Sequence, residues 1–134
     1  MEIHVDIKNE TDLVNARQKG RELAKKLDFS SCDLTLIATA ISELARNIIT
    51  YAGHGEIILS LIQQDNRDGI VIIASDQGPG IPDTKLAMTN GYSSSAGLGM
   101  GLPGVKRLMD DFKITSTTEQ GTTVTVKKWR VKVA

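Results

Sequence analysis

The sequence predicts an α+β fold, a two-layer α/β sandwich in which a mostly antiparallel, mixed sheet carries helices on one face. The length of 134 residues fits a single domain, residues 1–134, because domains usually span about 100–200 residues. The expected elements follow the order strand, two helices, two strands, helix and two strands, a grouping typical of an α+β layer. Aromatic residues make up only 4% of the chain, so we expect a core of Ile, Leu and Val.

The amino-terminal part of the chain predicts one strand and two helices. Apolar and polar residues alternate over residues 3–7, which is the pattern of a strand with one face in water. From residue 11 to residue 27 apolar positions recur at intervals of three and four, and either Asn9 or Thr11 could cap this helix. A second helix, apolar along much of its surface, is expected from about residue 32 to residue 51.

The rest of the chain predicts two hairpins, separated by a glycine-rich segment and a helix. Residues 56–63 and 69–75 have the composition of antiparallel strands joined by a turn at 65–68. Residues 76–101 form a long irregular segment, and such a loop in a compact domain is commonly a lid or a binding loop. The remaining elements are expected as a helix at 101–111 and strands at 113–118 and 122–131.

Charge and composition exclude several classes of protein. Lys and Arg number 16, as do Asp and Glu, and the pI is near 6.7, so the basic surface of a nucleic-acid-binding protein is not expected. No basic run or apolar stretch suits membrane binding or crossing, and we expect a cytoplasmic protein. The single cysteine, Cys32, is expected to be a buried packing residue. His4 and His54 are expected at the surface, and Trp129 is expected to pack on the last strand.

The first candidate site comes directly after the most apolar expected strand. It has the pattern D-x-G-x-G, made of Asp76, Gly78 and Gly80, and Ile81 follows. A carboxylate at the end of a strand can accept a hydrogen bond from an exocyclic amine, and glycines allow a flat ligand to approach the backbone. The same pattern also describes an ordinary turn after a strand, so these residues alone leave both interpretations open.

The second candidate site precedes the expected helix at 101–111. Its residues are Gly97, Leu98, Gly99, Met100 and Gly101. Glycines at a helix entry leave backbone N–H groups directed at solvent, where phosphate oxygens are readily bound, so the segment predicts a phosphate-binding loop. A dinucleotide-binding fingerprint requires a strand immediately before it, and residues 92–96 do not form one. A P-loop is excluded because the chain contains no G-K-[ST] sequence.

The third candidate site lies on the second expected helix. Glu43 and Asn47 are four residues apart, so they project from the same helix face and could contact one ligand. A carboxylate and an amide oxygen suit a magnesium ion that carries phosphates, and a spare carboxylate can accept a proton. The alternative is a solvated helix face in which Arg46 pairs with Glu43.

Taken together, these three motifs resemble the N, G1 and G2 boxes of the GHKL ATP-binding family. Their order matches, and Gly121-Thr122 corresponds to the G-T pair that precedes the family's last strand. The resemblance covers residues 40–125, and the segments SELARNI, DQGPGIP and GLGMGLPGVKRLMD are similar to those of small bacterial switch-protein kinases of the RsbT type. The fold implied is the Bergerat fold, which agrees with the α+β prediction.

The resemblance also implies a role for each site residue. Asp76 would bind the adenine amine, with help from Thr122 through water, and Asn47 would hold Mg²⁺ against the phosphates of ATP. Glu43 would act as the general base toward a serine or threonine hydroxyl of a protein substrate. The remaining ATP-binding residues would be Gly78, Gly80 and Ile81 at the adenine, and Gly97, Leu98, Gly99, Met100 and Gly101 at the triphosphate, with residues 84–96 as a lid.

The implied partners are STAS-domain antagonist proteins as substrates and a PP2C-type phosphatase that the chain activates when it is released. The alternative is a nucleotide-gated binding module, an anti-sigma factor or phosphatase co-activator that transfers no phosphate. A homodimer is compatible with the sequence. Anti-sigma kinases of the family commonly carry a His where this chain has Tyr51, and an Arg in the lid that is absent here. The candidates for a cation at the γ-phosphate are therefore Lys85, Lys106, Arg107 and Arg46.

Overall fold

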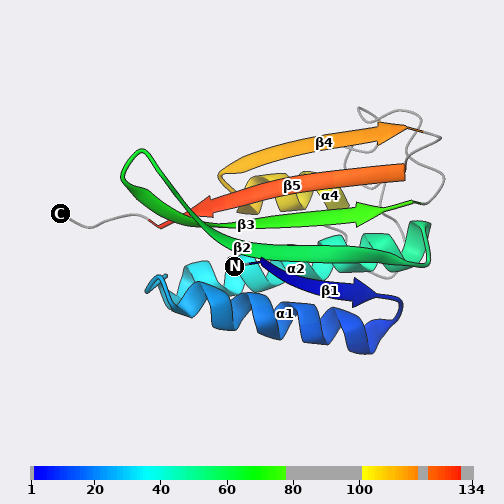
Figure 1. The fold of residues 1–134 in the computed structure, drawn as a ribbon, viewed down its shortest axis with the longest axis horizontal. Helices are drawn as coiled ribbons and strands as arrows, with labels where there is room; N and C mark the ends of the chain where they lie inside the picture. The colour runs from blue at the N-terminus through cyan, green and yellow to red at the C-terminus, as the bar shows by residue number, and fades with distance from the viewer. Residues whose placement is uncertain (1, 78–100, 118–120, 131–134) are drawn as a thin grey trace.

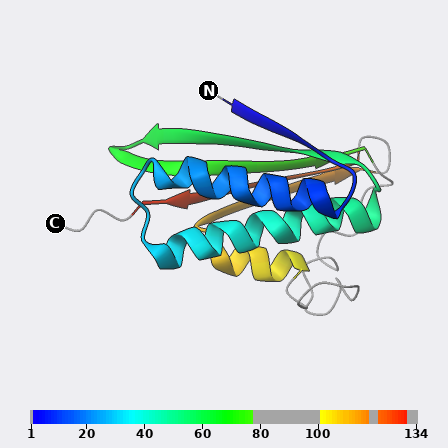
Figure 2. The ribbon, with the colours of Figure 1, turned by 90° about the horizontal axis from the view of Figure 1, so that it is seen from below.

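The computed structural model of the chain describes residues 2–77, 101–117 and 121–130. These residues form one antiparallel five-stranded sheet in the order β1-β2-β3-β5-β4, and the described helices cover one face of it (Figure 1, Figure 2). The elements are β1 (Glu2–Ile7), α1 (Glu10–Lys25), α2 (Ser31–Tyr51), β2 (Gly55–Gln64), β3 (Arg67–Asp76), α4 (Gly101–Leu108), β4 (Asp111–Thr117) and β5 (Gly121–Trp129). The predicted α+β class and its two layers are confirmed.

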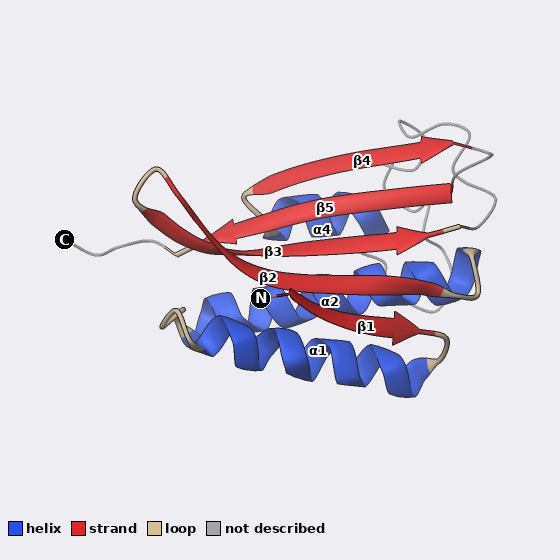
Figure 3. Cartoon of the chain, in the orientation of Figure 1, coloured by secondary structure: helices blue, strands red, loops and turns tan. Residues whose placement is uncertain are grey.

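The core lies between the sheet and the helices, and it is aliphatic as predicted. Side chains alternate between the two faces of each strand, so every second residue points toward the helices. One buried row crosses the sheet through Val5, Ile57, Ala74 and Val124. Helices α1 and α2 lie side by side under β1 to β3, and α4 lies beside α2 (Figure 3). Within the described ranges, no helix has the length and apolar character needed to cross a membrane.

The helix caps explain where α1 and α2 begin. The Asn9 side chain accepts a hydrogen bond from the backbone N–H of Asp12, and Ser30 does the same for Asp33, both at 3.1 Å. Of the two candidate caps, Asn9 is therefore the one used.

The prediction of a buried Cys32 is wrong, because this thiol is exposed. It lies two residues before the buried Leu34, about 200° around the helix, and so faces away from the sheet.

Two predicted boundaries are corrected by tight local pairing. The turn between β2 and β3 contains only Asp65 and Asn66, whose φ angles of 54° and 63° are those of a two-residue hairpin, so both strands are longer than expected. The helix expected to reach residue 111 ends at Leu108. Beyond it, the backbone N–H of Asp110 donates to the carbonyl of Lys127, which draws the chain into the sheet.

Candidate functional site

The end of β3 places an acidic side chain beside two hydroxyl groups. Asp76 is the cross-strand neighbour of Thr122 on β5, and Thr122 is the neighbour of Ser116 on β4. The hydroxyl oxygens of Ser116 and Thr122 are 2.8 Å apart. Asp76 lies two residues after the buried Ala74, so its side chain belongs to the sheet face that the helices cover. The sheet register therefore brings together Asp76 and Thr122, which come from distant parts of the sequence.

Gly121 fixes the approach of β5 to this carboxylate. Its φ angle is +81°, in the left-handed region that favours glycine, and a Cβ atom at this position would collide with the carbonyl oxygen of Asp76. The first residue of β5 can therefore be only glycine if the strand is to lie this close to the end of β3. This contact gives a structural reason for the Gly121-Thr122 pair that the sequence singled out.

Helix α2 contributes a buried carboxylate and an amide. The Glu43 side chain is buried, with only 4% of the residue exposed, and Asn47 is half-buried one helical turn later. Over the ranges that the structure describes, no hydrogen bond or ion pair reaches Glu43. A buried carboxylate without a partner is costly, and it is therefore uncommon unless it serves a function. The alternative of a solvated helix face is wrong for Glu43.

The expected pairing of Arg46 with Glu43 is also absent. Arg46 instead donates from its Nη1 atom to the Glu10 carboxylate at 2.9 Å, which ties α2 to the first turn of α1. Arg46, one of the candidate cations for the γ-phosphate, is therefore already paired with Glu10. Lys106 and Arg107 are exposed in the last turn of α4, and Lys85 lies outside the described residues.

Gly55, the first residue of β2, shows how close α2 comes to the end of β3. A Cβ atom on Gly55 would lie 2.7 Å from the Cγ2 atom of Ile48 and 3.1 Å from the Cβ atom of Asp76. Ile48 and Asp76 therefore border the same small space, and Asn47 directly precedes Ile48 on the helix. The helix motif and the strand-end carboxylate, 29 or more residues apart in sequence, are thus neighbours at one end of the molecule.

Most of the predicted ATP-binding residues lie outside the described ranges. They are Gly78, Gly80, Ile81, Gly97, Leu98, Gly99 and Met100. Gly101 is described: it is the first residue of α4, is buried and has a φ angle of +53°. Because α4 packs against α2, the amino-terminal end of α4 belongs to the same layer as Glu43 and Asn47.

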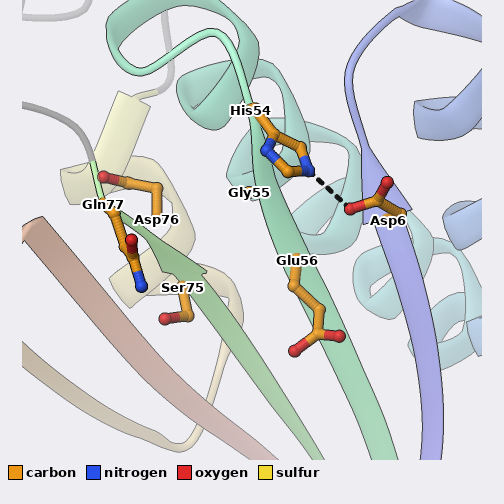
Figure 4. A pocket seen from close by; sticks show the side chains of 7 residues that line it. All are labelled: Asp6, His54, Gly55, Glu56, Ser75, Asp76 and Gln77. Carbon is orange, nitrogen blue, oxygen red and sulfur yellow. Dashed lines mark hydrogen bonds and ion pairs between the residues drawn. The ribbon is translucent and has the colours of Figure 1, made fainter.

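A cavity of about 340 Å³ adjoins Asp76 at the ends of β1, β2 and β3. It is lined by Asp6, His54, Gly55, Glu56, Ser75, Asp76 and Gln77 (Figure 4). Figure 4 shows the Asp76 carboxylate directed away from Ser75 and Glu56, as strand alternation requires. The sequence analysis did not find this cavity, because it depends on the pairing of β1 with β2, which places Asp6 opposite Glu56.

Two histidines pair with carboxylates on and beside this rim. His54 Nε2 lies 2.6 Å from an Asp6 oxygen, and this hydrogen bond lowers the pKa of Asp6 from its ordinary 3.8. His4 lies 3.1 Å from Glu56 and 3.1 Å from Glu2, and hydrogen bonds to these two carboxylates raise the pKa of His4 from 6.5. Both histidines are exposed, as the sequence predicted.

Two sequence relatives match most of the chain. Serine/threonine-protein kinase RsbT of Bacillus subtilis (strain 168) is 53% identical over 125 residues, which covers 93% of this chain and 94% of that protein. An anti-sigma F factor of Clostridium novyi (strain NT) is 35% identical and covers 77% of this chain and 76% of that protein.

Solved structures with low sequence identity share the fold. One contains the RsbU and RsbW domains of a Mycobacterium tuberculosis protein, with a TM-score of 0.63 at 18% identity, covering 98% of this chain and 33% of that one. The mycobacterial sensor histidine kinase MprB aligns with a TM-score of 0.55 at 19% identity, over 99% of this chain and 100% of that one. The family model described as histidine kinase-, DNA gyrase B- and HSP90-like ATPase matches residues 32–132. The chain belongs to this ATPase family, the GHKL family that its motifs resemble.

Proposed function

We propose that this chain is an ATP-dependent serine/threonine protein kinase that phosphorylates a STAS-domain antagonist protein in a bacterial partner-switching pathway. Membership of the ATPase family and the likeness to serine/threonine-protein kinase RsbT support the activity. The proposal takes ATP as the phosphoryl donor. It also assigns the protein to the cytoplasm, where ATP is available. Once released from its substrate, the chain activates a PP2C-type phosphatase by binding.

The buried Glu43 carboxylate is the observation on which the proposal rests. Nucleotide binding alone requires Asn47, Asp76 and the glycine segments, whereas phosphoryl transfer to a hydroxyl also benefits from a base. A carboxylate that is 4% exposed and has no partner in the described part of the chain is available for that task. A module that only binds nucleotide gives no reason to keep an unpaired charge in this place.

The chemistry follows from the positions of these residues. Glu43 takes the proton of the substrate hydroxyl as its oxygen attacks the γ-phosphate, the bond between the γ-phosphorus and the bridging oxygen breaks, and ADP leaves. Asp76 accepts a hydrogen bond from the exocyclic amine of adenine, and this contact selects the base and fixes its position. Such reactions depend mainly on positioning and on stabilisation of charge.

The residues present fit a magnesium ion. Asn47 offers an amide oxygen, a hard ligand that suits Mg²⁺ together with phosphate oxygens, and the Glu43 carboxylate lies about 6 Å away along the same helix face. Asn47 would hold the ion, which neutralises phosphate charge when it is bound. Glu43 would remain free of it and keep its role as the base.

Mass spectrometry tests the proposed activity directly. The chain is mixed with Mg-ATP and the STAS-domain proteins encoded in the same genome, and each product is weighed intact. We expect one STAS-domain protein to gain the mass of a single phosphate. A tight, nucleotide-dependent complex with no change in mass would instead identify a binding module, such as an anti-sigma factor or a phosphatase co-activator, and would refute the kinase proposal.

A further inference from the structure

A groove of about 450 Å³ lies on the sheet face that the described helices leave uncovered, at the end opposite Asp76. We call it the Trp129 groove. It is lined by Gln64, Arg67, Asp111, Phe112, Lys113, Thr125, Lys127 and Trp129. Trp129 pairs with Gly69, which is seven residues before Asp76 on β3, so the groove is roughly 23 Å from the proposed adenine contact. It is therefore separate from the nucleotide site.

Three of the lining side chains are cations without an ionic partner. Arg67, Lys113 and Lys127 have no carboxylate within 4.0 Å among the residues that the structure describes, whereas Lys128, on the other face of β5, pairs with Asp110 at 3.6 Å. The remaining charge in the groove is that of Asp111. Its carboxylate accepts a hydrogen bond from Trp129 Nε1 at 2.8 Å. The groove lining thus carries three positive charges against the one negative charge of Asp111, which is the cross-strand neighbour of Lys127.

The guanidinium group of Arg67 stacks on the Trp129 ring. Its Cζ atom lies 4.2 Å from the ring centroid, and the ring also packs on Gly69, where a Cβ atom would lie 2.7 Å from it. The backbone N–H of Trp129 also donates to Asp110 at 2.7 Å. Ordering an arginine before binding reduces the entropy lost on binding, and the planar group is suited to carboxylates.

We propose that the Trp129 groove docks an acidic polypeptide segment of the protein that the kinase phosphorylates. The inference rests on the proposed function for the identity of the partner, and on the groove itself for its chemistry. Three closely spaced cations suit a short run of Asp or Glu side chains. A nucleic acid fits less well, because the chain as a whole has no net positive charge.

A second copy of the chain also fits less well. Among the described strands, its acidic residues on the same sheet face are Glu2, Asp6, Glu56 and Asp111. Each already has a partner: Glu2 and Glu56 pair with His4, Asp6 pairs with His54, and Asp111 accepts from Trp129. To occupy the groove of another copy, these carboxylates would have to give up their present partners. The positive charge of the groove is complementary to an external acidic partner.

Nuclear magnetic resonance can observe the groove directly, because the chain contains one tryptophan and so gives one indole N–H signal. The full-length chain, labelled with nitrogen-15, is titrated with hexaglutamate and separately with hexaglutamine. We expect hexaglutamate to shift the indole signal in a saturable way and hexaglutamine to leave it unchanged. An unshifted signal at saturating hexaglutamate would overturn the proposal.

The STAS-domain substrate provides the second measurement. The double variant Lys113→Glu with Lys127→Gln should bind this protein about tenfold more weakly, at unchanged ATP affinity, because one favourable charge is reversed and a second is removed. It leaves the Trp129 and Arg67 contacts in place. The matched control, Lys19→Glu with Arg21→Gln, makes the same change of charge at exposed cations of α1 and should bind within twofold of the unaltered chain. Equal binding by both double variants would overturn the proposal.

The remaining outcomes separate this inference from the proposed function. If phosphate is transferred at the same rate with and without the Lys113 and Lys127 substitutions, the docking proposal is refuted and the kinase proposal is not. A chain that binds the STAS-domain protein through the groove but transfers no phosphate refutes the kinase proposal alone. An indole shift that appears when the chain is concentrated without a partner identifies a second copy, and an equal shift with duplex DNA identifies nucleic acid; either result would overturn the assignment.

Discussion

The substitution Glu43→Gln should make the protein inactive as a kinase and more stable at the same time. Gln has nearly the same shape as Glu but carries no charge and cannot act as a base. Glu43 is 4% exposed and has no partner in the described chain, although its carboxylate oxygens are not among the fully buried atoms that lack a hydrogen bond. Its replacement therefore removes the cost of holding a charge with little access to water. Function and stability should therefore change in opposite directions, as is common at active sites.

The magnitudes follow from the two roles of the side chain. Loss of a general base lowers the rate of phosphoryl transfer by about 10²–10⁴, which corresponds to roughly 3–5 kcal/mol in the activation free energy. Relief of the buried charge should raise the free energy of unfolding by about 1 kcal/mol, or roughly 4 °C in Tm for a domain of this size. ATP affinity should stay within about threefold, because Asn47 and Asp76 are unchanged.

Three assays and one control variant test the predicted effects of Glu43→Gln. Single-turnover transfer of labelled phosphate to the STAS-domain protein measures the rate, calorimetry measures ATP affinity, and thermal unfolding measures Tm. The control is Glu22→Gln, an exposed residue of α1, which should leave all three unchanged. A Glu43→Gln variant that transfers phosphate at the normal rate would show that Glu43 is not the base. A variant that is less stable would show that the carboxylate has a structural partner.

The other predictions concern base recognition, packing and pH. Asp76→Asn should weaken ATP binding at least tenfold by calorimetry, because a hydrogen bond to a charged acceptor is lost; unchanged affinity would remove its adenine role. Gly20→Ala should lower the free energy of unfolding by about 1–3 kcal/mol, because the added Cβ atom collides with the buried Ile41 and this outweighs the better helix propensity of Ala. The further change Ile41→Val should restore part of the lost stability. The raised pKa of His4, due mainly to Glu56, means that its stabilising contribution is complete below pH 6.5 and is lost as pH rises through the folded-state value; His4→Gln should abolish this part of the pH dependence of Tm, and an unaltered dependence would contradict it.

The type and order of the elements could be predicted because their periodic patterns agree with their burial. The alternation in residues 3–7 and the helical stripe through Leu34, Ile37 and Ile41 correspond directly to core residues. Element ends were less predictable, because long-range contacts decide them. The backbone hydrogen bond from Asp110 to Lys127 ends α4 early, and no local sequence pattern indicates it. The exposure of Cys32 follows from its angle around α2, which composition does not indicate.

The site could be predicted in part because each motif carries its own chemistry. Asp76 and Thr122 are brought together by sheet register. Gly121 could be recognised only through the family resemblance, and the structure adds the reason, because its close approach to Asp76 leaves no room for a Cβ atom. The burial of Glu43 could not be read from the sequence, since a polar helix face and a buried site give the same spacing. The Trp129 groove could not be predicted either, because its cations come from β3, β4 and β5, whose order in the sheet, β3-β5-β4, differs from their order in the chain.

A crystal structure of the chain with Mg²⁺ and a non-hydrolysable ATP analogue tests the central claim most directly, namely that Glu43, Asn47 and Asp76 serve one nucleotide. We predict that the adenine amine lies within about 3.2 Å of the Asp76 carboxylate and that the phosphates lie beside Asn47 and Gly101. The γ-phosphate should lie where a hydroxyl can reach both it and Glu43. A nucleotide bound elsewhere, for example in the Trp129 groove or against Asp6 and His54, would contradict the account.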